Sequence, residues 1–141
     1  MIIPFGINFK IFCIFSLKYL DLSKNALATL PEEQPNLPSL EILLLNENQL
    51  ASIPDYIGLC GNIRKIDWSF NKLSALPDSV CNLRHMEEMH IHNNLITHLP
   101  EDLGNLWRYA NLIFYSSLFY SILYFYIGEI FEETNKPKSL L

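Results

Sequence analysis

The sequence predicts an α/β solenoid, a coil of short repeats in which every turn adds one strand to a parallel sheet. Three observations predict it. The middle of the 141-residue chain repeats every 23 residues, and each period opens with alternating apolar and polar residues, which is typical of a short strand. Each period also carries one asparagine and one proline at fixed positions. The units begin at Leu17, Leu40, Ile63 and Met86.

Each unit follows the pattern L-x-x-L-x-L-x-x-N-x-L-x-x-L-P, with Ile, Met or Trp at some of the leucine positions. The alternation within L-x-L indicates a strand with one face turned inward. The asparagine both donates and accepts hydrogen bonds, so it can satisfy backbone groups at a bend inside the coil. We expect a structural ladder of these residues, formed by Asn25, Asn48, Asn71 and Asn94. The Leu-Pro pair begins the return path, because proline fixes φ and cannot extend a strand ladder.

This pattern resembles the leucine-rich-repeat family, specifically its 23-residue intracellular kind with L-P-x-x-I-x-x-L return segments. Ras-suppressor-like and Scribble-like scaffolds carry repeats of this sort. The resemblance covers about residues 17–108. It implies parallel strands on a concave face and loops or short helical turns on the convex face. It also implies that the chain binds a protein partner through the concave face, as an intracellular scaffold or adaptor in signalling.

Four segments follow from this pattern. Residues 1–16 are expected to be a degenerate N-terminal cap or partial repeat, and 17–108 the leucine-rich-repeat domain. Residues 134–141 are polar, and we expect a disordered tail. Residues 109–133 are apolar and aromatic, and three interpretations stay open: a degenerate fifth repeat with Leu112 and Phe114 in core positions, a membrane helix, or a tail foreign to the solenoid.

The membrane interpretation depends on the uncharged run 112–128. Its 17 residues lie at the short end of the length that a bilayer-spanning helix needs. The alternative function is therefore a membrane-anchored, receptor-like fragment with leucine-rich repeats, in which 112–128 is the anchor.

Charge and cysteine content limit the other classes of function. Ten Lys and Arg residues stand against fifteen Asp and Glu, a net charge of −5, whereas a nucleic-acid binder needs a basic surface to neutralise phosphates. The three cysteines, Cys13, Cys60 and Cys81, have neither the spacing of a metal knuckle nor that of a redox pair. With no N-x-S/T sequon in the chain, this favours a reducing, cytoplasmic setting.

The outward positions of the strands predict a partner-binding surface. Ile42, Leu44 and Phe70 are informative there, because an exposed strand position has no structural need for an apolar side chain. Apolar residues within a charged rim are typical of a protein interface. The expected surface consists of Tyr19, Asp21, Ile42, Leu44, Lys65, Asp67, Phe70, Glu88, His90 and His92.

Two kinds of chemistry were weighed at this surface. Glu88, His90 and His92 share one strand face and have zinc-ligand side chains, but no fourth ligand is visible, so we expect neither metal nor cofactor. Asp21 and Asp67 lie two coils apart, roughly 10 Å, which is a carboxylate spacing that hydrolysis can use. Nothing in the sequence shields that pair or raises its pKa, so we expect no catalytic residues and no enzyme.

Overall fold

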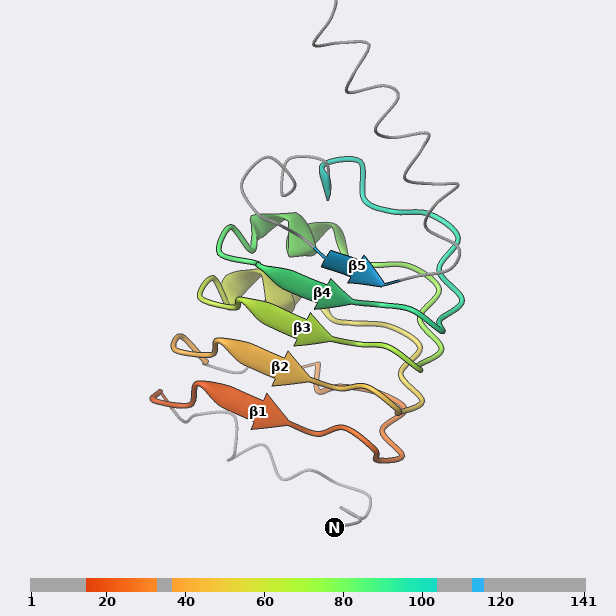
Figure 1. The fold of residues 1–141 in the computed structure, drawn as a ribbon, viewed down its shortest axis with the longest axis horizontal. Coiled ribbons are helices and arrows are strands. Elements are labelled where there is room, and N and C mark those ends of the chain that lie inside the picture. The colour runs from red at the N-terminus through yellow and green to blue at the C-terminus, as the bar shows by residue number, and fades with distance from the viewer. Residues whose placement is uncertain (1–14, 33–36, 104–112, 116–141) are drawn as a thin grey trace, which may run out of the picture.

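The computed structural model describes residues 15–32, 37–103 and 113–115. Its strands form one parallel sheet in chain order, each lying beside the next (Figure 1). Here a coil means one repeat unit, counted from the N-terminus. The strands are β1 (Tyr19–Asp21), β2 (Ile42–Leu44), β3 (Lys65–Asp67), β4 (Glu88–His90) and β5 (Ile113–Tyr115). This arrangement confirms the predicted solenoid.

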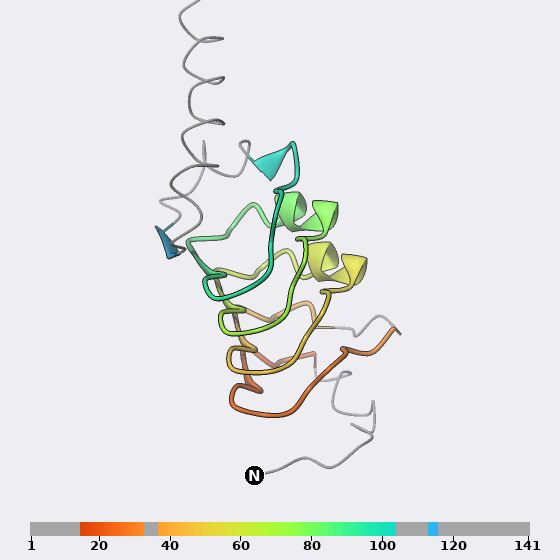
Figure 2. The ribbon, with the colours of Figure 1, turned by 90° about the vertical axis from the view of Figure 1, so that its right-hand side faces the viewer.

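Short helices lie on the side of the coil opposite the sheet (Figure 2). Two 3-10 helices are described, η2 (Asp55–Leu59) and η3 (Asp78–Asn82), and they pack against each other. Each follows an extended proline, Pro54 or Pro77, which ends the outward path of its coil. Each also turns one aliphatic residue, Ile57 or Val80, into the core. The convex side therefore supplies the second wall of the core.

The core fills the space between the sheet and these helices. The central residue of β2, β3 and β4 is buried in each case, as are Leu45, Trp68 and Ile91 two positions further on. Burial continues along the chain through one cluster, because each coil covers the apolar side of its neighbour. Trp68 is fully buried, and its indole N–H finds no acceptor among the described residues.

The asparagines join successive coils through their side chains. Nδ2 of Asn71 donates to the carbonyl oxygens of Trp68 (3.1 Å) and Ser69 (3.2 Å) in its own coil, and to that of Leu45 (3.0 Å) in the preceding coil. Its Oδ1 accepts from the backbone N–H of Leu50 at 2.9 Å. Asn48 and Asn94 make the corresponding bonds to the coils before them. One amide thus satisfies backbone groups of two coils at once.

The first coil is the least covered. Leu20, Leu22, Leu27 and Leu30 are only partly buried, whereas the corresponding leucines of the second coil lie in the buried core. Apart from Phe15 and Ser16, the cap expected over residues 1–16 lies outside the described residues, as does the tail expected over 134–141.

The fifth strand departs from the 23-residue spacing. The Cα partner of Glu88 is Ile113 and that of Met89 is Phe114, so β5 follows β4 after 25 residues. A frame of 23 had placed Leu112 beside Met89, and that alignment is wrong by two residues. The apolar run gave no reason to choose another frame, because almost every position in it is hydrophobic.

Replacing Asn71 with alanine tests the asparagine ladder. The substitution leaves the N–H of Leu50 and the carbonyl of Leu45 without their partner in a buried site, and each such loss costs about 1–3 kcal/mol. We expect the free energy of unfolding in urea to fall by about 3 kcal/mol. Asn25→Ala is the matched control, with a loss of about 1 kcal/mol, because Asn25 bonds only Leu22 and Ser23 of its own coil. Equal losses would contradict the role of bonds between coils.

The close approach of η2 to η3 depends on Gly58. A Cβ at this position would lie 2.4 Å from the backbone oxygen of Ser79, so one helix must move to admit it. We expect Gly58→Ala to lower the free energy of unfolding by about 1–3 kcal/mol. Gly61→Ala is the control, because a Cβ there meets nothing within 4 Å. Thermal unfolding of both variants compares the two positions, and equal stability would contradict this account of the helix packing.

Candidate partner-binding face

The strand register arranges the expected partner-binding residues in rows. Tyr19, Ile42, Lys65 and Glu88 are successive Cα partners, and so are Asp21, Leu44, Asp67 and His90. The residue between the two rows on each strand points into the core, so both rows lie on the opposite side of the sheet. We call these eight residues, together with Phe70 and His92, the outer sheet face.

The C-terminal part of this face is neutralised by its own ion pairs. Oε2 of Glu88 lies 2.9 Å from Nζ of Lys65, and Oε1 lies 2.5 Å from Nε2 of His90. The hydrogen bond from His90, followed by that from Lys65, holds the pKa of Glu88 below its usual value of 4.5. These three side chains therefore fix one another in place.

The two aspartates are anchored in the same way in coils 1 and 3. Oδ1 of Asp21 accepts from the backbone N–H and the hydroxyl of Ser23, at 2.9 and 2.6 Å. Oδ1 of Asp67 accepts from the same groups of Ser69, at 3.0 and 2.6 Å. The bonds from Ser23 lower the pKa of Asp21. Within the described ranges, neither aspartate forms an ion pair.

The apolar residues lie in two places on the face. Ile42 and Leu44 are half-buried on β2. Phe70 lies three residues beyond β3, is 50 % exposed, and contacts the ring of His92 in the next coil, with centroids 5.2 Å apart and planes at 80°. Nδ1 of His92 is buried and has no hydrogen-bond partner in the part of the chain that the structure describes.

Phe70 occupies a left-handed backbone conformation, with φ at 53°. Lys24, Glu47 and Asn93 adopt the same conformation at the same place in their coils. The N–H of Phe70 there donates to the carbonyl of His92 at 3.0 Å, so the stacking of the coils requires this backbone. Such a conformation costs roughly 1–2 kcal/mol for most residues and least for asparagine and glycine. Sequence reasoning missed this strain, although the asparagine at 93 was a signal for it.

Comparison with known proteins agrees with this geometry. The family model for the Leucine Rich Repeat matches residues 16–37, the first coil and its surroundings. The solved structure of a leucine-rich-repeat protein from Leptospira interrogans is 28 % identical and superposes with a TM-score of 0.61. The match covers 70 % of this chain and 25 % of that chain. The chain is a leucine-rich-repeat protein. No curated protein matches the chain, and the resemblance to Ras-suppressor-like and Scribble-like scaffolds stays a prediction.

Leucine-rich-repeat proteins generally mediate protein–protein interactions, and their fold is typically a non-enzymatic interaction module. In the described part of this leucine-rich-repeat protein, no three His, Cys, Asp or Glu side chains gather as metal ligands would. None of the helices described is long and apolar enough to cross a membrane. Most of the uncharged run 112–128 lies outside the described residues.

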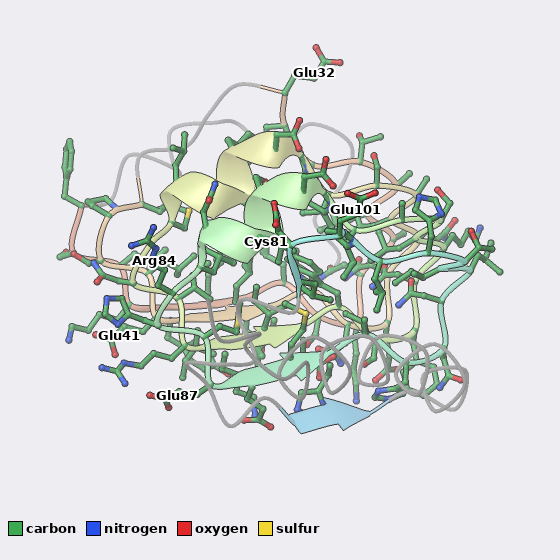
Figure 3. The ribbon with its side chains drawn as sticks, turned by 90° about the horizontal axis from the view of Figure 1, so that it is seen from above. Glu32, Glu41, Cys81, Arg84, Glu87 and Glu101 are labelled. Atoms are coloured by element: carbon green, nitrogen blue, oxygen red, sulfur yellow. The ribbon has the colours of Figure 1, made fainter. Side chains whose placement is uncertain are left out.

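A row of ion pairs runs along the edge of the sheet where the strands begin, and sequence reasoning missed it. Lys18 pairs with Glu41 at 2.8 Å, and Arg64 pairs with Glu87. Glu41 and Glu87 lie on the same side of the molecule (Figure 3). The spacing of 23 residues from Lys18 to Glu41 was the available signal. These pairs are largely exposed, so each contributes little to stability.

Glu88 makes stability depend on pH. A carboxylate whose pKa is lowered by folding adds stability above its unfolded pKa and loses it as the pH falls through the folded pKa. The chain should therefore keep a constant advantage in unfolding free energy over Glu88→Gln above roughly pH 5.5. That advantage should shrink as the pH falls below 4.5, the ordinary value for the group. Urea unfolding of both proteins at several pH values measures it, and a constant difference down to pH 3 would contradict the prediction.

Proposed function

We propose that this leucine-rich-repeat protein is an intracellular adaptor or scaffold that binds one partner protein through the outer sheet face, in a signalling setting. The signalling role and the cytoplasmic location come from the resemblance of its repeats to intracellular scaffolds. The binding site is the full outer sheet face defined above, with apolar side chains on β2 and after β3 and charged side chains beside them.

Phe70 is the single observation that carries this proposal. The fold needs a left-handed residue at this position, which asparagine fills with less strain at 93. A half-exposed phenylalanine there costs stability and exposes aromatic surface to water. Costly conformations persist where they serve a function, and aromatic residues are enriched at the energetic centres of interfaces.

The chain also offers a rigid support for such a site. The strands, the asparagine ladder and the ion pairs among Lys65, Glu88 and His90 fix the side chains before a partner arrives. A preorganised surface loses less conformational entropy on binding than a flexible one.

The alternative, a membrane-anchored fragment, has less support. Residues Ile113–Tyr115 of the proposed anchor pair with β4 as a strand of the sheet. A residue in this sheet cannot at the same time belong to a helix that spans a bilayer. We therefore favour the adaptor.

Substituting Phe70 separates binding from folding. Phe70→Asn relieves the left-handed strain and loses the contact with His92, so its free energy of unfolding should stay within about 1 kcal/mol of the parent. In a pull-down with quantitative mass spectrometry, we expect a partner that the full chain captures to be lost with Phe70→Asn. The same partner should be lost with Ile42→Ser and Leu44→Ser combined.

Glu47→Asn is the matched control for this experiment. It makes the same change to a left-handed residue one coil earlier, outside the proposed site, so it should retain the partner. Circular dichroism establishes that all four proteins are folded. Capture of the same proteins by all four would overturn the proposal and place binding elsewhere on the chain.

A further inference from the structure

We infer that the partner inserts a basic side chain, arginine or lysine, next to an aliphatic side chain that packs on Leu44. This inference rests on the proposed function and specifies the chemistry of the protein segment bound at the outer sheet face.

The register places Leu44 between two carboxylates. Asp21, Leu44 and Asp67 are Cα partners on three adjacent strands, so the two aspartates stand about 10 Å apart with a leucine between them. Leu44 is half-buried and keeps part of its side chain at the surface. An apolar centre flanked by carboxylates suits a partner segment that is both apolar and basic.

Both carboxylates are oriented and retain acceptor capacity. Each aspartate is held through Oδ1 by the N–H and hydroxyl of the serine two residues on. Oδ2 of Asp67 accepts no hydrogen bond from the residues that the structure describes. A guanidinium or ammonium group can therefore bind without displacing the serine.

The cations already on this side of the sheet are engaged with other groups. Lys65 pairs with Glu88 at 2.9 Å, and Lys24 lies 3.7 Å from Glu47. The positive charge that complements the two aspartates must therefore come from the partner. A second copy of this chain is a poor source, because each copy carries a net charge of −5.

Phe70 points to the same chemistry independently of the aspartates. Its ring is half-exposed and lies three residues after Asp67 in the same coil. Aromatic faces attract ammonium and guanidinium groups as well as apolar side chains. A basic residue of the partner would thus meet a carboxylate and a ring together.

The test is a selection of random dodecapeptides displayed on phage, carried out on the full chain and on three variants. Asp21→Asn with Asp67→Asn removes both charges and keeps an oxygen for each serine. Asp55→Asn with Asp78→Asn is the matched control, because it removes the same charge from exposed residues of η2 and η3. Phe70→Asn reports on the proposed function itself.

We expect the full chain and the matched control to select peptides with arginine or lysine beside Leu, Ile, Val or Phe. The Asp21, Asp67 variant should bind such a synthetic peptide about tenfold more weakly, the loss of one charge-assisted contact. That difference should diminish in high salt. Peptides that depend on Phe70 but show no basic enrichment would overturn this inference and leave the proposed function standing. Peptides that depend on neither site, or no selected peptides at all, would overturn both.

Discussion

Hydrogen bonds from asparagine side chains between successive coils are the interaction on which the rest of this structure depends. The strands are only three residues long, so the chain must bend soon after each one, inside a core that holds few other polar groups. Asn48, Asn71 and Asn94 satisfy the backbone at that bend and reach into the preceding coil. Each coil is therefore stabilised chiefly by its neighbour, and the register of the whole sheet follows from a repeated local contact.

This same bend determines what the outer sheet face can display. The residue before each asparagine is held left-handed, and the strand residues before it are held in register, whatever side chains they carry. The surface is thereby freed from the task of folding. A leucine between two aspartates, or a phenylalanine where asparagine is easier, changes recognition without changing the path of the backbone. Binding residues on such a support are rigid, which favours specific association.

The sequence alone predicts the repeated part of this fold well, because columns of residues 23 apart average out the exceptions in any one unit. The alignment of Ile42 with Lys65 and the inward position of Met89 follow directly from that spacing. β5 does not, since an almost uniformly apolar run fits several frames equally. At the candidate site, the rows could be predicted, but not the strain at Phe70 or its contact with His92. Backbone conformation and contacts between coils are properties of the stacked structure, which no single unit contains.

The third coil concentrates the departures from the repeat. It buries Trp68 without an acceptor for its indole N–H, a cost of about 1–3 kcal/mol. It also holds Phe70 in a strained, half-exposed position and carries Asp67 between them. Stacking alone would be served by leucine and asparagine at the first two of these positions, as other coils show. Trp68 faces the core and Phe70 faces solvent, so the first departure is explained by filling space and the second is not. A feature of the surface that lowers stability without improving packing is best explained by contact with another molecule.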